Sequence, residues 1–222
     1  MSKVLVTGFG PFGHTPINPA QKVAEALDGT RIGGAEVASV IVPNVFFESI
    51  DVVAGAIAEV KPEIVLMLGE YGGRSMITVE RLAQNLNDST RYDLVDNDGV
   101  SLQDRLTAPD GPVAYYSTVP IRAIVKAMRA AGIPADISDA PGTFGCNHLM
   151  YGVLHHIATA GLPVRAGWIH LPHLPVVAAL EQNLGAPSMT VETAVAGMSA
   201  GITAALEHRE DIADPIPSRF QI

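Results

Sequence analysis

The stretch KVLVTGFGPFG, residues 3–13, places a short apolar run directly before a glycine-rich turn. Its first five residues, KVLVT, are mostly β-branched or aliphatic and predict a strand. The turn that follows, GFGPFG at residues 8–13, has the G-x-G-x-x-G spacing of a dinucleotide-binding loop. Ligands of open α/β sheets bind where the strands end. The stretch therefore predicts the first strand of such a sheet and one edge of a ligand site.

Short β-branched runs alternate with longer segments of helical period along the rest of the chain. IVLML at residues 64–68, for example, is an uninterrupted apolar run typical of a strand at the centre of a sheet. The alternation predicts an α/β fold, a three-layer α/β/α sandwich around a mostly parallel, mixed and twisted sheet. The other expected strands are residues 37–42, Ala135–Ser138 and 164–171, and the expected helices are Pro19–Leu27, Glu48–Val60, 121–131, 146–159 and Val191–Glu207.

Residues 69–120 differ from the rest, because they are rich in Gly, Asn and Asp and carry no clear periodicity. Long irregular segments in compact domains are often functional, so we expect this segment to contribute to the site. Its DNDG sequence, residues 96–99, does not fit an EF-hand. With Gly99 at the sixth position of the loop, Leu94 and Arg105 occupy the first and twelfth positions, where Ca²⁺ requires oxygen ligands.

The composition indicates a globular protein of 222 residues, with 48% apolar and 17% charged residues. This length predicts a single domain over residues 1–222, with a tail at 211–222 that is either loose or packed on a neighbouring subunit. The net charge is −9 and the 14 basic residues are scattered, which argues against nucleic acid or a membrane as a partner. A single cysteine, with no signal peptide or transmembrane run, predicts a cytoplasmic protein.

The glycine-rich turn lacks the context of a dinucleotide site. Pro11 lies inside it, and Pro16 and Pro19 delay the next helix, whereas a Rossmann loop leads directly into the helix that faces the pyrophosphate. An acidic residue for the ribose is also missing from the end of the second strand. We therefore favour a tight turn whose aromatic residues, Phe9 and Phe12, either line a small apolar pocket or pack in the core. A dinucleotide-binding protein stays an alternative.

Cys146 is the only cysteine and lies in DAPGTFGCNHLMYGVLHH, where Gly142 and Gly145 precede a segment of helical period. A thiol at a helix N-terminus meets the positive end of the helix dipole, so we expect a lowered pKa and a larger thiolate fraction. The backbone amides of Gly145 and Cys146 are candidates for an oxyanion hole. These features suit a catalytic nucleophile, and a small residue of the core is the alternative.

Among the seven histidines, His170 has the position most suited to a partner of Cys146. It ends a predicted strand at the sheet edge where the helix of Cys146 begins, as a thiol–imidazole pair requires. His173 shares the following loop and is not separated from His170 by spacing, whereas His148 faces away from Cys146 around the helix. These residues predict a cysteine hydrolase or transferase. The acidic residues available to orient the imidazole are Glu70, Glu80, Asp88, Asp93, Asp96 and Asp98.

Four blocks of the sequence together resemble the type I pyroglutamyl peptidases, or pyrrolidone-carboxylate peptidases, of cysteine peptidase family C15. The blocks are VLVTGFGPFG with Asn18-Pro19, GEYGGRSMITVERLAQN, GTFGCNHLMYGVLHH and GWIHLPHLP. They span nearly the whole chain, and the last two are the most specific. The resemblance implies hydrolysis of the amide bond after an N-terminal pyroglutamyl residue through a thioester. It also implies that no metal or cofactor is needed, and that the protein assembles as a homotetramer.

The resemblance also implies a role for each site residue. Cys146 corresponds to the nucleophile, His170 to the general base, and Glu80 to the glutamate that completes the triad. A pyroglutamyl group presents a flat lactam without a free amine, which suits a pocket of aromatic rings and backbone groups. The residues implied to bind or lie near the substrate are Phe9, Phe12, Asn18, Glu70, Arg91 and Gly145.

Glu70 and Tyr71 depart from the family pattern, because relatives often carry Gln and Ala at these positions. If Glu70 faces the site, we expect its carboxylate either to accept the lactam N–H or to disfavour a thiolate by repulsion. A Glu70 that turns to solvent is the alternative. The departure leaves open a related cysteine amidase that acts on another lactam or acyl group.

Overall fold

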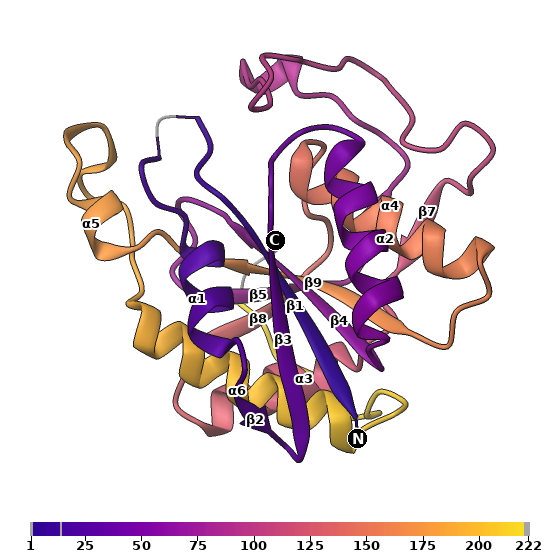
Figure 1. The fold of residues 1–222 in the computed structure, drawn as a ribbon. Coiled ribbons are helices and arrows are strands. Elements are labelled where there is room, and N and C mark those ends of the chain that lie inside the picture. Colours follow the sequence, from indigo (N-terminus) through magenta and orange to yellow (C-terminus); the bar gives the residue numbers. More distant parts are fainter. Residues whose placement is uncertain (1, 14, 220–222) are drawn as a thin grey trace.

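Helices cover both faces of a seven-stranded sheet in the computed structural model, which describes residues 2–13 and 15–219 (Figure 1). The strands are β1 (Lys3–Phe9), β2 (Arg31–Ile32), β3 (Ala35–Val42), β4 (Ile64–Glu70), β5 (Ile77–Glu80), β8 (Ala135–Ser138) and β9 (Arg165–Leu171), in the order β2-β3-β1-β4-β9-β5-β8. β1, β3, β4 and β9 are parallel, β5 and β8 run opposite to them, and β2 is antiparallel to β3. The predicted α/β sandwich around a mostly parallel, mixed sheet is confirmed.

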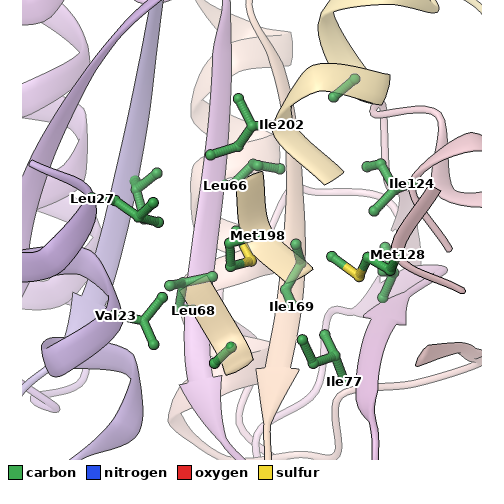
Figure 2. Close-up of a cluster of buried hydrophobic side chains, with 14 of the residues drawn as sticks. Val23, Leu27, Leu66, Leu68, Ile77, Ile124, Met128, Ile169, Met198 and Ile202 are labelled. Atoms are coloured by element: carbon green, nitrogen blue, oxygen red, sulfur yellow. The ribbon is translucent and has the colours of Figure 1, made fainter. Parts of the chain in front are cut away.

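The two helical layers bury separate apolar clusters against the sheet. Figure 2 shows Leu66 and Leu68 of β4 and Ile169 of β9 beside Met198 and Ile202 of one covering helix. No helix within residues 2–13 and 15–219 combines the length and hydropathy needed to cross a membrane. On the face drawn in Figure 2 lie α1 (Pro19–Leu27), α3 (Ile121–Ala130) and α6 (Val191–Glu207), and on the opposite face lie α2 (Glu48–Val60) and α4 (Gly145–Thr159).

Strand β4 explains how one apolar run serves both layers. Successive side chains of a strand point to opposite faces. Leu66 and Leu68 therefore join the cluster under α6, while Val65 and Met67 join the cluster under α4. All four side chains are fully buried, as expected for a central strand covered on both sides.

The direction in which the chain crosses the sheet reverses after β3. Helix α1 connects β1 to β3 on one side, and α2 then carries the chain back past β1 to β4. Ligands of open α/β sheets bind at such a reversal, outside the carboxyl ends of the strands. Those ends place Phe9 of β1, Glu70 of β4 and His170 of β9 at one edge of the sheet.

The segment 69–120, expected to be irregular, contains short strands, and that expectation is corrected. It holds β5 of the main sheet, a two-stranded sheet of β6 (Leu82–Gln84) and β7 (Ala114–Tyr116), and the 3₁₀ turn η1 (Thr90–Tyr92). β5 has four residues, all of them buried, so it shows neither the length nor the alternation that marks a strand in a sequence. Four expected elements have the exact predicted bounds: α1, α2, β8 and α6.

The described part of the C-terminal tail lies along α3 of its own chain. The Asp211 carboxylate accepts the backbone N–H groups of Arg122 and Ala123 at 3.0 and 3.1 Å, so it caps the start of this helix. Further along, Lys126 donates to Asp214 at 2.5 Å. Residues 220–222 of the predicted tail lie outside the described residues.

Candidate active site

A cavity of about 320 Å³ opens at the carboxyl ends of β1, β4 and β9. Its lining is mostly apolar and includes a few polar groups, as in most small-molecule sites. The structure thus brings six of the nine sequence-predicted site residues to one cavity. Those that line it are Phe9, Phe12, Asn18, Glu70, Cys146 and His170.

Cys146 is the second residue of α4, and its thiol points toward the end of β4. A Cβ atom built on Gly69 would lie 3.0 Å from the Cys146 Sγ and 2.5 Å from the ring of Trp168. Only glycine leaves room there for both side chains. Gly69, which lies beside the thiol, pairs with His170 in the register of β4 and β9. The imidazole and the thiol are therefore brought to the same end of the sheet.

The prediction that the helix N-terminus lowers the pKa of the Cys146 thiol is wrong. Burial raises this pKa well above the usual range, and the negative charges of Glu80 and Glu70 raise it further, although Arg74 opposes them. The helix dipole acts within one turn, whereas desolvation and the neighbouring carboxylates come from the tertiary fold. These surroundings favour the neutral thiol over the thiolate.

His170 and Glu80 form a buried pair across antiparallel strands. Thr78 of β5 stands opposite His170 of β9, and Glu80 follows two residues later on the same face. The His170 Nδ1–H donates to Glu80 Oε1 at 2.7 Å, and the two side chains are 1% and 0% exposed. Within the described residues, the Nε2 atom of His170 has no hydrogen-bond partner. This nitrogen is thus available as a base at the cavity.

The charges around the pair favour a neutral imidazole beside an ionised carboxylate. Burial opposes the ionisation of Glu80, but the hydrogen bond from His170 and the positive charge of Arg74 hold its pKa below the usual value. Burial lowers the pKa of His170, and Arg74 lowers it further, against the opposing effect of Glu80. A neutral His170 can accept a proton at pH 7.

Arg74 is a site residue that our sequence reasoning missed. Its Nη1 donates to Glu80 Oε1 at 2.8 Å. The same carboxylate oxygen also accepts the hydrogen bond from His170. The signal was available, because Arg74 lies in the block GEYGGRSMITVERLAQN six residues before Glu80. A search for acidic partners of a histidine does not find the cation that pairs with the acid.

Phe9 and Phe12 form an aromatic wall of the cavity together with their neighbours. The ring of Phe9 lies 5.6 Å from that of Trp168, and the ring of Phe12 lies 5.1 Å from that of Phe144. Phe9 is only 4% exposed, so it packs in the core and lines the cavity at once. The two alternatives that the sequence left open for this residue both hold.

Asn18 lines the cavity and also caps α1. Its Oδ1 accepts the backbone N–H of Ala20 at 2.9 Å, and its Nδ2 donates to the carbonyl of Gly10 at 3.1 Å. The cap therefore fixes the glycine-rich turn against the start of the helix. The helix begins only at Pro19, as expected, so the turn does not lead into a helix end.

Gly145 and Arg91 lie outside the set of residues that line the cavity. A Cβ on Gly145 would approach the Asn44 Oδ1 to 2.1 Å, so glycine is needed at this first position of α4. Arg91 is exposed, with its guanidinium 5.0 Å from the ring of Tyr92. Tyr92, rather than Arg91, reaches the cavity.

Glu70 faces the cavity and pairs with His173. The His173 Nδ1 lies 2.7 Å from Glu70 Oε1, and both residues line the cavity. Burial raises the pKa of Glu70, although its hydrogen bonds with His173 and Thr15 oppose this effect. The alternative of a solvent-facing Glu70 is wrong, and of the six candidate acids it is Glu80 that orients His170.

His148 points away from Cys146, as predicted, and is a buried structural residue. The Phe47 N–H donates to its Nε2 at 2.8 Å, so Nδ1 carries the proton and donates to the Thr107 hydroxyl at 3.1 Å. Burial lowers the pKa of this imidazole to about 4. His148 therefore stays neutral and ties α4 to two loops.

Comparison with known proteins decides the family. The model of the family described as pyroglutamyl peptidase matches residues 2–208. The chain belongs to the pyroglutamyl peptidase family. A pyrrolidone-carboxylate peptidase of Mycobacterium tuberculosis is 68% identical to it over 222 residues, which cover 100% of both chains.

Solved structures of this pyroglutamyl peptidase family have the same fold. The pyroglutamyl peptidase I of Bacillus amyloliquefaciens superposes with a TM-score of 0.91 at 36% identity, over 96% of this chain and 100% of the other. The pyrrolidone carboxyl peptidase of Thermococcus litoralis gives 0.91 at 38% identity, over 97% and 100%. The predicted family, fold and cysteine peptidase activity are confirmed.

Proposed function

We propose that this pyroglutamyl peptidase cleaves the amide bond after an N-terminal pyroglutamyl residue with Cys146, His170 and Glu80 as its catalytic triad. What supports the proposal is one cavity lined by a thiol, by an imidazole with a free Nε2, and by two aromatic rings. Glu80 lies behind His170 and fixes the tautomer that leaves Nε2 unprotonated. The arrangement needs no metal or cofactor to supply a nucleophile or a base.

The cavity suits a lactam ring rather than a free amino terminus. Phe9 and Phe12 offer flat apolar faces to a five-membered ring, and a pyroglutamyl group has no ammonium that would need a carboxylate anchor. The lactam still has one N–H donor and one carbonyl acceptor. The Glu70 carboxylate, which lines the cavity, is the acceptor that we assign to the N–H. Asn18 and the loop of Arg91 border the same space.

Acylation begins with a proton transfer that accompanies attack. The Cys146 thiol gives its proton to His170 Nε2 as its sulfur forms a bond to the scissile carbonyl carbon. The carbonyl oxygen becomes an oxyanion next to the start of α4, where no side chain caps the first N–H groups. The amides of Gly145 and Cys146 are the donors that we assign to it. Glu80 stabilises the imidazolium that forms.

The imidazole next acts as an acid, which completes acylation, and then again as a base in deacylation. His170 gives the proton from Nε2 to the leaving amine, the carbon–nitrogen bond breaks, and a pyroglutamyl thioester remains on Cys146. The neutral imidazole then takes a proton from water, and the hydroxide oxygen attacks the thioester carbonyl. The carbon–sulfur bond breaks, the thiol regains its proton, and free pyroglutamate leaves.

The proposal is tested with a pyroglutamyl fluorogenic amide and the matched prolyl amide, which lacks the lactam carbonyl. We expect rapid release from the first substrate only, and loss of release in Cys146→Ser and Cys146→Ala. Rapid quenching followed by mass spectrometry should detect the acylated wild-type enzyme. Full activity of Cys146→Ser would refute the assignment of the nucleophile, and preference for another acyl amide in a substrate panel would indicate a related amidase.

We also propose that the protein is cytoplasmic, as its composition predicts, and that it assembles as a homotetramer, as its resemblance to the family implies. Large apolar side chains available for subunit contacts include Val113, Tyr116 and Leu184, which are 87%, 71% and 71% exposed. Burial of such residues between subunits would remove apolar surface from water. Light scattering after gel filtration should give the mass of four chains, and a monomer would contradict the assembly. Cell fractionation tests the location.

A further inference from the structure

Arg74 lies in the loop between β4 and β5, and its guanidinium is almost buried, with the side chain 11% exposed. Its Nη1 donates to Glu80 Oε1 at 2.8 Å and also to the Thr78 hydroxyl. Its Nη2 donates to the hydroxyl of Ser138, on strand β8, at 3.2 Å. One side chain thus joins the two neighbouring strands behind the triad.

Two chains of contact lead from Arg74 to the imidazole. The first passes through Glu80, whose Oε1 accepts from both Arg74 and His170, at 2.8 and 2.7 Å. The second passes through Tyr71, because the guanidinium carbon lies 3.9 Å from the centre of the tyrosine ring. The same ring meets the His170 ring edge to face at 5.2 Å. Arg74 therefore holds two of the groups that contact His170, and a third is the ring of Trp168, 5.6 Å from the imidazole.

Arg74 also sets the charge balance at the reacting groups. The other charged or titratable groups that face this point are Glu80 from β5, Glu70 and Tyr71 at the end of β4, His173 after β9 and the Cys146 thiol of α4. The positive charge of Arg74 disfavours an imidazolium at His170 and favours ionisation of the thiol. Glu80 acts in the opposite direction on both groups. A fixed cation therefore offsets the carboxylate of the triad.

We propose that Arg74 is a positioning residue for the reaction, which holds Glu80 and Tyr71 against His170 and keeps the imidazole neutral, with Nε2 able to accept the thiol proton. The inference rests on the proposed function of the triad and adds a fourth member to it. Arginine suits this role because its planar fork bonds a carboxylate and a hydroxyl at once and stacks on an aromatic ring.

The test compares Arg74→Gln and Arg74→Lys with wild type. The matched control is Arg129→Gln, because Arg129 pairs with the buried Asp136 on the same strand as Ser138, through Nη2 at 3.1 Å. Two quantities are measured for each protein. One is the pH dependence of kcat/KM on a pyroglutamyl amide, and the other is the titration of the His170 imidazole in the substrate-free enzyme by NMR.

For Arg74→Gln we expect the ascending limb of kcat/KM and the His170 titration to move up together by about one pH unit. At pH 7 the loss in kcat/KM should then be about 10- to 100-fold. Arg74→Lys keeps the positive charge, so both titrations should stay near wild type while kcat falls, since an ammonium cannot form the fork or the stacking contact. Arg129→Gln should leave both the pH dependence of kcat/KM and the His170 titration unchanged.

An unshifted His170 titration in a folded Arg74→Gln protein would overturn the inference, and so would equal upward shifts in Arg74→Gln and Arg129→Gln. If Arg74→Gln does not fold, the lysine variant decides: an unchanged kcat overturns the role in positioning. The NMR titration separates this inference from the proposed function. A wild-type enzyme inactive on pyroglutamyl amides would refute that function, whereas the His170 titration would still report on Arg74.

Discussion

His170 and Glu80 share a buried hydrogen bond of 2.7 Å, although 90 residues separate them in the chain. Their strands are antiparallel neighbours, in a sheet whose other central pairs are parallel. This local reversal is what brings Glu80, at the end of β5, behind His170 of β9. The bond leaves Nε2 as the ring nitrogen of His170 that can accept a proton at the cavity.

Replacing Glu80 by Gln should lower kcat/KM by about 10²- to 10⁴-fold, because an amide cannot stabilise the imidazolium that forms during attack. Glu80 raises the pKa of His170, so its loss should also move the ascending limb of the pH profile to lower pH. That direction is opposite to the shift expected for Arg74→Gln. Glu63→Gln, which breaks the surface pair with Arg165, serves as the control. A Glu80→Gln enzyme with wild-type rates would contradict the triad.

The Cys146 thiol should react slowly with iodoacetamide at pH 7 and faster as the pH rises, because burial and the carboxylates of Glu80 and Glu70 keep it protonated. Glu70→Gln removes one negative charge, so the rate at pH 8 should increase severalfold. Glu36→Gln, at the far end of β3, controls for the change in net charge. An alkylation rate that is constant between pH 6 and 9 would indicate a thiolate and contradict this account.

Much of the fold could be predicted from the sequence, because its helices are amphipathic or apolar over many residues and its central strands are continuous apolar runs. The bounds of α1, α2 and α6 follow directly from such patterns. Strand β5 could not be predicted in this way. Its four residues are held by pairing with β8 and β9, which lie far away in the sequence. Tertiary pairing, rather than local preference, makes this segment a strand.

The chemistry of the site was harder to predict from the sequence than the identity of its residues. Position along the chain pointed to Cys146 and His170, because nucleophile and base must meet at one sheet edge, whereas Glu80 followed only from the resemblance to the family. The protonation state of Cys146 was predicted wrongly, since a helix position is visible in the sequence but the burial of a side chain and the carboxylates that approach it are not. The role of Arg74 depends in the same way on contacts made only in the folded chain.

Substituting Gly69 by Ala should impair both stability and catalysis. The added Cβ would lie 2.5 Å from Trp168 Cζ2 and 3.0 Å from Cys146 Sγ, so the indole and the thiol must shift. We expect a loss of about 1–3 kcal/mol in the free energy of unfolding, measured by urea, and a lower kcat. Gly55→Ala is the matched control, because a Cβ on that glycine of α2 meets nothing within 4 Å. Equal behaviour of the two variants would contradict the packing argument.

The buried imidazole of His148 should make the protein less stable as the pH falls. Its pKa is lowered to about 4 in the folded state, against 6.5 for an unperturbed histidine. Above pH 6.5 neither state binds the proton. Between 6.5 and about 4 the unfolded state binds it and the folded state does not, so stability falls across this window and levels off below it. The contribution of this group amounts to about 3 kcal/mol.

Urea unfolding of wild type and His148→Gln at pH 7, 5.5 and 4 isolates this contribution. A glutamine can still accept the Phe47 N–H, but it has no proton to gain in this range. The difference in unfolding free energy between the two proteins should therefore shrink, or reverse in favour of the variant, as the pH falls from 7 to 4. His156→Gln, half-buried on the last turn of α4, controls for the loss of an imidazole from this helix. Parallel pH curves for wild type and His148→Gln would mean that the folded protein protonates His148 as readily as the unfolded chain does.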